Sequence, residues 1–280
     1  MRIYRHAAEI PPRGERAVAA FGVFDGVHLG HVKIISTAVS EARRKALSCA
    51  VITFNRHPRE ITEHKAPDFL MTLSHRLEHI GALGVDVCLV LDFTPAFAAT
   101  TAEEFVRRYV VELFGAAAVV IGRTQRFGAS RLGDCALMRE LGRRAGFETL
   151  VVEPVQVDGL VISSSLIRQR VAQGDLPGAA RMLGRSYIIE ATVVRVEKRA
   201  GTLRVFLDPH NEAVPAQGRF EALIIRGRDQ GRAVATKQAN ADCLEIECPN
   251  DFPVDVGHDL RVELGRRCGE GSNPGPFDSL

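Results

Sequence analysis

The chain has 280 residues, of which 46% are hydrophobic, and 36 Lys and Arg balance 34 Asp and Glu to a formal net charge of +2. This composition is too apolar and too evenly charged for an intrinsically disordered protein. It also gives no general electrostatic attraction to nucleic acid or to a membrane surface. We therefore expect one large or two smaller globular domains, each of roughly 100–200 residues.

The start of the chain, MRIYRHAAEIPPRGER, has no apolar stretch of the kind found in a signal peptide. No apolar run is long enough to span a bilayer. The six cysteines are scattered and show no C-x-x-C spacing, which favours reduced thiols packed as small apolar residues. These features predict a cytoplasmic protein without a membrane partner.

Up to about residue 155, short apolar runs alternate with amphipathic stretches. The runs are rich in Val and Ile and predict buried strands at residues 18–24, 49–54, 85–91, 118–122 and 149–155. Helices are predicted between them at 30–45, 74–83, 102–114 and 132–145, with Thr101 capping the third and Gly146 ending the fourth. Such alternation predicts an α/β fold with a parallel sheet covered by helices on both faces. Ligands of these sheets bind beyond the carboxyl ends of the strands.

The pattern changes near residues 184–187. Further strands are predicted at 188–198, 203–207, 220–226, 243–248 and 260–264, with a hairpin turn at 199–202 and no convincing helix between them. We expect a small antiparallel β-barrel or sandwich. The predicted division is a first domain at 1–185, a second at 186–268 and a flexible tail at 269–280.

The loop after the first predicted strand carries the densest chemistry. It reads FGVFDGVHLGH over residues 21–31, so that His28 and His31 flank the start of a helix. The backbone can approach a phosphate closely at its glycines, and a helix N-terminus offers free N–H groups to an anion. A histidine in a loop is often only a surface residue, but this placement favours phosphate chemistry.

A second polar cluster follows the fifth predicted strand. Ser163, Ser164 and Ser165 follow one another, and Arg168 comes about one turn into the helix that they begin. Helix capping alone would explain one serine. Hydroxyl groups together with a guanidinium can also grip phosphate oxygens. If this cluster and the histidine loop emerge at the same edge of the sheet, they form one site.

Taken together, these motifs resemble the bacterial FAD synthetase family, within the H-x-G-H nucleotidyltransferase superfamily. The resemblance covers about residues 15–190 and rests on FDGVHLGH at 24–31, TFNRHPRE at 53–60, GRTQRFG at 122–128, SSSLIR at 163–168 and GDLPGAARMLGR at 174–185. It implies a Rossmann-like nucleotidyltransferase domain followed by a β-barrel of riboflavin kinase type.

The resemblance also implies the reaction: AMP passes from ATP to the phosphate of FMN, giving FAD and pyrophosphate, with Mg²⁺ held mainly through phosphates rather than by protein ligands. His28, His31, Ser164 and Arg168 would be the catalytic residues. The ATP-binding residues would be Gly22, Phe24, Asp25, Gly30, Ser163 and Ser165. The FMN-binding residues would be Phe54, His57, Pro58, Thr124 and Phe127. Phe54 fits the core of its strand equally well.

The chain departs from the family pattern at three places. Thr124 and Gln125 stand where the family has Asp or Asn followed by Phe, and Leu166 replaces an Arg. The second domain lacks the kinase stretch G-[FY]-P-T-A-N, and TKQAN at 236–240 lies too far downstream to replace it. We therefore expect FMN adenylyltransferase activity without riboflavin kinase activity. Two alternatives are a nucleotidyltransferase with a different phosphate acceptor and a non-catalytic nucleotide- or flavin-binding regulator. The sequence indicates small-molecule partners only, and no oligomeric state.

Overall fold

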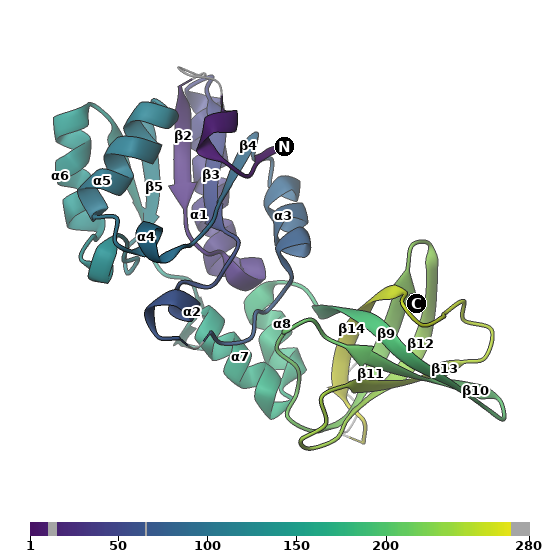
Figure 1. Cartoon of the computed structure of the whole chain (residues 1–280). Helices are drawn as coiled ribbons and strands as arrows, with labels where there is room; N and C mark the ends of the chain where they lie inside the picture. Colours follow the sequence, from purple (N-terminus) through teal and green to yellow (C-terminus); the bar gives the residue numbers. More distant parts are fainter. Residues whose placement is uncertain (11–15, 65, 270–280) are drawn as a thin grey trace. The chain divides into compact units, whose positions relative to one another are not determined.

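A computed structural model describes residues 1–10, 16–64 and 66–269 (Figure 1). They fall into two compact units, which are described separately. The first unit comprises Met1–Pro67 and Leu73–Val161, and the second comprises Asp68–Thr72 and Ile162–Leu280. The predicted tail lies, apart from Gly269, outside the described residues. Within these residues, no helix has the length and apolar character needed to cross a membrane.

The first unit is built on a six-stranded parallel sheet with the strand order β1-β4-β3-β2-β5-β6. Its strands are β1 (Arg2–Tyr4), β2 (Ala17–Phe21), β3 (Ser48–Phe54), β4 (Val87–Leu91), β5 (Ala118–Gly122) and β6 (Glu148–Val152). The predicted parallel sheet is confirmed. The edge strand β1 was not predicted, because its three residues, two of them exposed, show no periodicity. The predicted strand 18–24 was too long, since β2 ends at Phe21 and Phe24 takes a left-handed backbone conformation.

Helices connect the strands. They are α1 (Leu29–Arg44), α2 (Pro58–Thr62), α3 (Leu73–Ala82), α4 (Pro95–Ala98), α5 (Ala102–Phe105) with a π-helical continuation at Val106–Leu113, and α6 (Cys135–Ala145). The predicted caps are confirmed, because the side chain of Thr101 accepts a hydrogen bond from the amide of Glu104 and Gly146 ends α6 in a left-handed conformation. The predicted start of the last helix at 132 was wrong. Asp134 caps α6 by accepting hydrogen bonds from the amides of Ala136 and Leu137.

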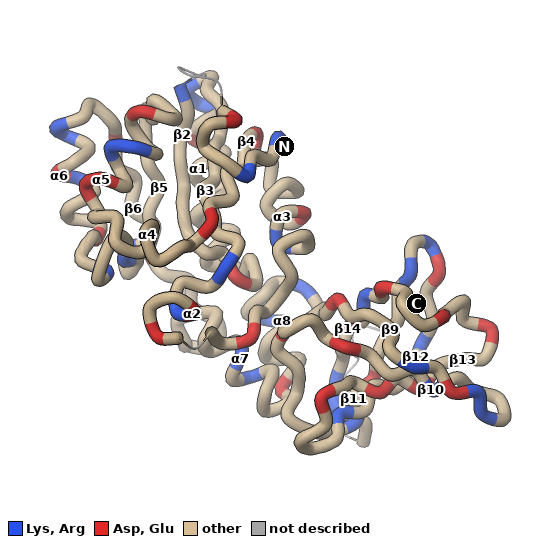
Figure 2. The backbone as a smooth tube through the Cα atoms, in the orientation of Figure 1, with Lys and Arg blue, Asp and Glu red and all other residues tan. Residues whose placement is uncertain are grey.

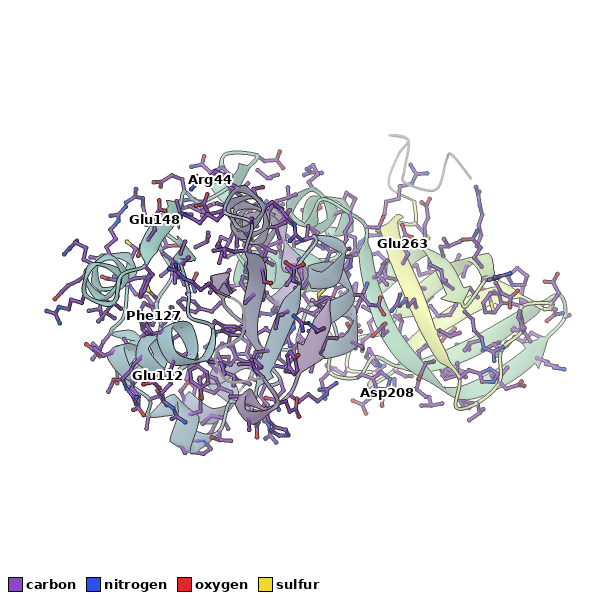
Figure 3. All side chains as sticks on the ribbon, turned by 90° about the horizontal axis from the view of Figure 1, so that it is seen from above. Arg44, Glu112, Phe127, Glu148, Asp208 and Glu263 are labelled. Atoms are coloured by element: carbon purple, nitrogen blue, oxygen red, sulfur yellow. The ribbon has the colours of Figure 1, made fainter. Side chains whose placement is uncertain are left out.

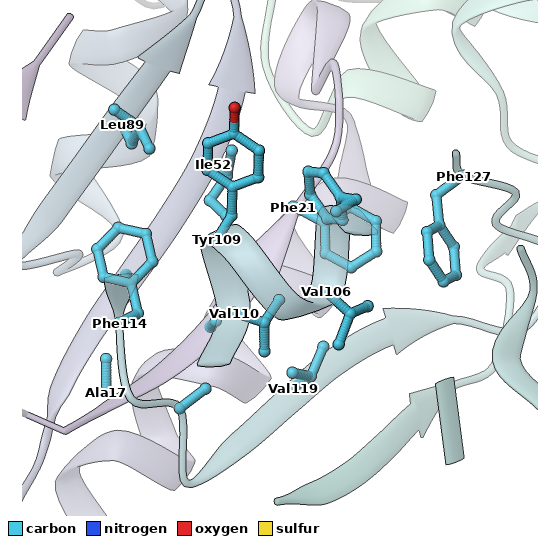
Figure 4. Packing of buried hydrophobic residues seen from close by; sticks show 14 of the residues in the cluster. Ala17, Phe21, Ile52, Leu89, Val106, Tyr109, Val110, Phe114, Val119 and Phe127 are labelled. Atoms are coloured by element: carbon cyan, nitrogen blue, oxygen red, sulfur yellow. The ribbon is translucent and has the colours of Figure 1, made fainter. Parts of the chain in front are cut away.

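The core of this unit lies between the sheet and the α5 segment (Figure 4). Phe21 at the end of β2 contacts the rings of Phe105 and Phe127, with centroid distances of 5.0 and 5.3 Å. Phe127, in the loop after β5, is buried, whereas Glu112 on the π-helical segment is exposed (Figure 3). Apolar burial on this scale supplies the main stabilisation of the sheet.

The strand order fixes where loops converge. The chain runs from β2 through β3 to β4 on one side, and β5 and β6 lie on the other side of β2. The direction in which successive strands are added to the sheet therefore reverses between β2 and β5. Such a switch point is where open parallel sheets bind ligands. The histidine loop follows β2 and the GRTQRFG loop follows β5, so both lie at this point.

The second unit contains α7 (Ser164–Gln173), α8 (Leu176–Leu183) and a closed antiparallel barrel with the strand order β10-β13-β12-β11-β14-β9. Its strands are β9 (Tyr187–Arg199), β10 (Thr202–Asp208), β11 (Gly218–Arg226), β12 (Asp229–Lys237), β13 (Leu244–Pro249) and β14 (Asp259–Arg267). The predicted barrel and its hairpin turn at 199–202 are confirmed. Strand β12 was missed because its sequence, DQGRAVATK, is largely polar and half-exposed.

Two features of the second unit were not visible in the sequence. Helices α7 and α8 group with the barrel, so the compact units divide at Val161, whereas the predicted division at 185 follows the change from helices to strands. In addition, the segment Asp68–Thr72 belongs to the second unit. The Phe69 amide donates to the Asn211 carbonyl at 3.0 Å, and the Ala213 amide donates to the Phe69 carbonyl at 2.7 Å.

Candidate active site

The loop after β2 is tight and buried. A short 3-10 turn, Asp25–Val27, joins β2 to α1, and its residues are all buried. Gly26 has φ +78°, a conformation that glycine adopts without steric cost, and Phe24 and Val27 also have positive φ values. These turns let α1 begin immediately after the loop, so its N-terminal amides face the switch point.

His28 and His31 come together at the start of α1, as the sequence predicts. His28 caps the helix, because its Nδ1 accepts a hydrogen bond from the His31 amide at 3.3 Å. The two rings are stacked with centroids 3.6 Å apart, and the ring of Phe24 meets His31 edge-on. Since Nδ1 of His28 is an acceptor, a neutral His28 carries its proton on Nε2.

His31 is electrostatically unusual. Burial lowers its pKa well below the ordinary value, and the nearby charges of His28 and Arg76 lower it further. The ring is therefore neutral at pH 7. Its buried Nδ1 has no hydrogen-bond partner among the described residues. Such an atom is rare in a folded protein and is explained here if a ligand completes the site.

Arg76, which sequence reasoning missed, lies beneath the histidine loop. It is only 1% exposed, and its guanidinium donates to the carbonyl of Val23 at 2.6 Å and to that of Phe54 at 2.7 Å. Burial lowers the pKa of Arg76, while the carboxylate of Asp25 opposes this effect. An arginine directly before the buried Leu77 of an amphipathic helix was the only signal in the sequence.

The loop after β5 contributes an inward-facing amide. Gln125 donates from Nε2 to the Phe21 carbonyl at 2.7 Å, and its Oε1 accepts from the Gly122 amide at 3.3 Å. It thus joins the ends of β2 and β5 across the switch point. Of the predicted flavin-binding residues in this loop, Thr124 is exposed and Phe127 is packed into the core.

The end of β3 and the loop after it carry the other predicted flavin-binding residues. Phe54 is 7% exposed and contacts Phe93 and Phe97 at centroid distances of 5.3 and 5.5 Å. His57 caps α2, with its Nδ1 accepting from the Arg59 amide at 3.2 Å, and Pro58 begins that helix. His57 and Pro58 are half-buried, so they leave more surface for a ligand than Phe54 does.

The serine cluster lies in the second unit. Ser163 caps α7 by accepting a hydrogen bond from the Leu166 amide at 3.2 Å, Ser164 begins the helix, and Arg168 lies one turn later and is half-buried. One serine is therefore used for capping. That Ser164 and Arg168 join His28 and His31 in one site stays a prediction.

Other reactive groups are scarce. Among the described residues, no group of three or more His, Cys, Asp or Glu side chains is arranged to hold a metal ion. The six cysteines are free thiols, and burial raises the pKa of Cys49 and of Cys88 to about 12, which keeps both thiols protonated. Charges of both signs are interspersed along both units (Figure 2).

Comparison with known proteins agrees with this architecture. The family model described as FAD synthetase matches residues 10–166, which is more than half of the chain. The bifunctional riboflavin kinase/FMN adenylyltransferase of Pseudomonas fluorescens is 31% identical over 203 residues, 72% of this chain and 65% of the relative. That of Bacillus subtilis is 34% identical over 191 residues, 67% of this chain and 60% of the relative. The matched segments thus span less than two thirds of these relatives.

A solved structure also resembles the chain. The crystal structure titled as a macrolide-efflux protein from Streptococcus pneumoniae has a TM-score of 0.83 and 26% sequence identity, and the alignment covers 100% of this chain and 94% of that one.

Proposed function

The chain belongs to the FAD synthetase family, and from this premise we propose that it transfers the AMP group of ATP to the phosphate of FMN, giving FAD and pyrophosphate. The observation that carries this proposal is the stacked pair His28 and His31 at the switch point, where a buried ring nitrogen of His31 has no partner among the described residues. A phosphate oxygen would supply that partner.

The proposed reaction is a direct in-line displacement. An oxygen of the FMN phosphate bonds to the α-phosphorus of ATP, and the bond from that phosphorus to the bridging oxygen of the β-phosphate breaks with its electron pair leaving on pyrophosphate. No residue forms a covalent intermediate. The chain contributes positioning and charge stabilisation, and Mg²⁺ arrives as part of the MgATP substrate, bound through phosphate oxygens.

Each predicted residue has a place in this scheme. The imidazoles of His28 and His31 would contact the α- and β-phosphates, and Ser164 and Arg168 would hold the leaving β- and γ-phosphates. The remaining ATP contacts would come from Gly22, Phe24, Asp25, Gly30, Ser163 and Ser165. Because Phe24 and Asp25 are buried, their backbone groups are the parts suited to contact the nucleotide.

The flavin would meet the loops after β3 and β5. His57, Pro58 and Thr124 keep surface for such a contact. Phe54 and Phe127 are each 7% exposed, so they would support the flavin wall from the core side. The functional division that we propose is a nucleotidyltransferase domain at 1–185 and a barrel at 186–268, acting in the cytoplasm on small molecules.

We also propose that the barrel has no riboflavin kinase activity. Strands β9 and β10 are joined by the two residues Ala200 and Gly201, so a phosphate-binding loop has no room in this connection. In the TKQAN stretch, Thr236 and Lys237 end strand β12, and the Lys237 ammonium donates to the Ala241 carbonyl. This local hydrogen bond supports the interpretation that the similarity to the kinase motif is accidental.

The decisive experiment incubates the full chain with ATP, Mg²⁺ and FMN and follows FAD by chromatography. Formation of FAD is the expected result. Transfer of AMP to another phosphate acceptor would instead support a changed acceptor, and nucleotide or flavin binding without turnover would support a regulator. A parallel reaction with riboflavin in place of FMN should yield no FMN, and its appearance would contradict the proposed loss of kinase activity.

His31→Ala tests the catalytic assignment. We expect kcat for FAD formation to fall by about 100-fold or more, because a hydrogen-bond donor to the transition state is removed. Far-UV circular dichroism should show the fold intact. The exposed His6 gives the matched control, since His6→Ala should leave kcat within about twofold of the wild type. Near-normal turnover by His31→Ala would refute the role of His31.

A further inference from the structure

We propose that Arg76 is a positioning residue that holds the histidine loop in its phosphate-binding shape. The inference rests on the proposed function and adds to it a residue that touches no substrate. Arg76 is 1% exposed, so it acts through the backbone that it binds rather than through a ligand.

The geometry links the two loops that flank the site. One terminal nitrogen of Arg76 donates to Val23, the second residue of the loop after β2, and the other donates to Phe54, the last residue of β3. A planar guanidinium keeps its two donors at a fixed separation. This separation sets the distance between the two carbonyls. It thereby sets the spacing between the histidine loop, which would contact ATP, and the loop after β3, which would contact the flavin.

The loop is held from several elements. The Val23 carbonyl also accepts a hydrogen bond from Thr53 Oγ1 at 3.0 Å, and the Phe21 carbonyl, two residues earlier, accepts one from Gln125. Arg76 is the charged member of this set. Burying a guanidinium costs free energy that an apolar side chain of similar volume would avoid, so its presence under the loop calls for a role beyond filling space.

Arg76 also shapes the charge of the site. The charged or titratable groups that act on His31 are His28 from the same loop and Arg76 from α3, and Asp25 in the loop acts on Arg76. Removing the guanidinium charge would make protonation of His31 easier. Arg76 therefore affects both the shape of the loop and the protonation state of its second imidazole.

The test compares Arg76→Met, Arg76→Lys and a matched control, Arg43→Met, in the full chain. Like Arg76, Arg43 binds a backbone carbonyl. Its guanidinium donates to the Gly84 carbonyl and to the carboxylate of Asp86, which directly precedes β4 at the amino ends of the strands. For Arg76→Met we expect kcat to fall by about tenfold or more while KM for FMN changes less than about threefold. The acid limb of its kcat profile should move to higher pH. Arg76→Lys should keep the acid limb of the wild type. Arg43→Met should keep both the kcat and the acid limb of the wild type.

A second measurement does not need turnover. Hydrogen–deuterium exchange of the full chain without substrate should be faster in peptides covering residues 22–31 for Arg76→Met, and moderately faster for Arg76→Lys, while β5 stays unchanged. Equal exchange and equal kcat in wild type and Arg76→Met would overturn the proposal. If Arg76→Met does not fold, wild-type exchange and kcat in Arg76→Lys would overturn it instead.

The two proposals can fail separately. If the wild-type chain forms no FAD, the proposed function fails, and Arg76 is then judged by loop exchange and by ATP affinity in equilibrium dialysis. If FAD forms but Arg76→Met loses activity only in proportion to lost thermal stability, with an unmoved acid limb, Arg76 has a structural role only and the inference is wrong.

Discussion

At the scale of single residues, the neutral imidazole of His31 couples stability to pH. Its pKa in the folded chain lies well below 6.5, chiefly because of burial. Below pH 6.5 the unfolded chain takes up a proton at this position while the folded chain does not. The folded state therefore loses stability as the pH falls through this window and regains it as the pH rises, until the slope vanishes above the unfolded pKa.

This predicts a difference between wild type and His31→Gln. Between pH 7 and pH 5 the free energy of unfolding of the wild type should fall more steeply, by at most about 1.4 kcal/mol for each pH unit. Urea unfolding at a series of pH values measures the slopes. The exposed His6 gives the control variant His6→Gln, which should keep the slope of the wild type. Equal slopes for wild type and His31→Gln would contradict the neutral state of His31.

Gln125 has hydrogen-bond partners that the sequence alone does not indicate. It stands where the family pattern has Phe, and this departure is a reason to consider a different phosphate acceptor. In the structure its amide group joins the carbonyl of Phe21 to the amide of Gly122. The motif pattern indicates the substitution, but only the fold shows that the amide reaches backbone 104 residues away.

At the scale of elements, helix α6 depends on its cap. Asp134 accepts hydrogen bonds from the amides of Ala136 and Leu137, which lower its pKa together with Arg126. The sequence predicts the start of this helix at residue 132. The structure leaves Leu132 75% exposed and outside the helix, since the carboxylate of Asp134 satisfies the first free amides.

Replacing this cap should destabilise the first unit. Asp134→Ala should lower the free energy of unfolding by about 1 kcal/mol, whereas Asp134→Asn, which can still accept the amide hydrogen bonds, should lose less. Chemical denaturation followed by circular dichroism at pH 7 measures the difference. Because the pKa of Asp134 is lowered in the folded chain, the advantage over Ala should shrink as acid protonates the carboxyl. An Ala variant as stable as the wild type would contradict the capping role.

At the scale of the whole molecule, the segment Asp68–Thr72 does not belong to the unit of its neighbours in the sequence. It lies between two helical elements of the first unit in sequence, yet it belongs to the second unit by its contacts. Phe69 pairs with backbone at 211 and 213, and Thr72 donates to a carboxylate oxygen of Glu190 on β9. The barrel therefore includes a piece of chain that precedes it by more than a hundred residues.

Leu70 tests this pairing. Its side chain is 1% exposed, so Leu70→Ala should cost about 2–5 kcal/mol through lost burial and a cavity. We expect faster hydrogen–deuterium exchange at Ala213 and in strand β9 and a lower unfolding temperature. The exposed Leu132 provides the control, because Leu132→Ala should change stability by less than about 0.5 kcal/mol. Unchanged exchange in the barrel would show that the segment is not part of its stability.

Much of the fold was predictable because local patterns of apolar and polar residues indicate its helices and strands. The run AVVIG predicts β5 at its observed bounds, and the contiguous histidine loop carries one of the motifs that indicate the family. Local periodicity fails where few apolar residues mark an element. This is why β12, with alternating half-exposed polar residues, and the three-residue β1 escaped prediction.

The sequence by itself determined most of the elements, the histidine loop, the motifs shared with the family and the change to a barrel, because each is encoded by neighbours in the chain. Only the tertiary structure decided the strand order that creates the switch point, the inward turn of Gln125 and the burial of Arg76 under Val23 and Phe54. These features depend on hydrogen bonds between residues far apart in sequence, and such bonds leave no periodic signal in the chain itself.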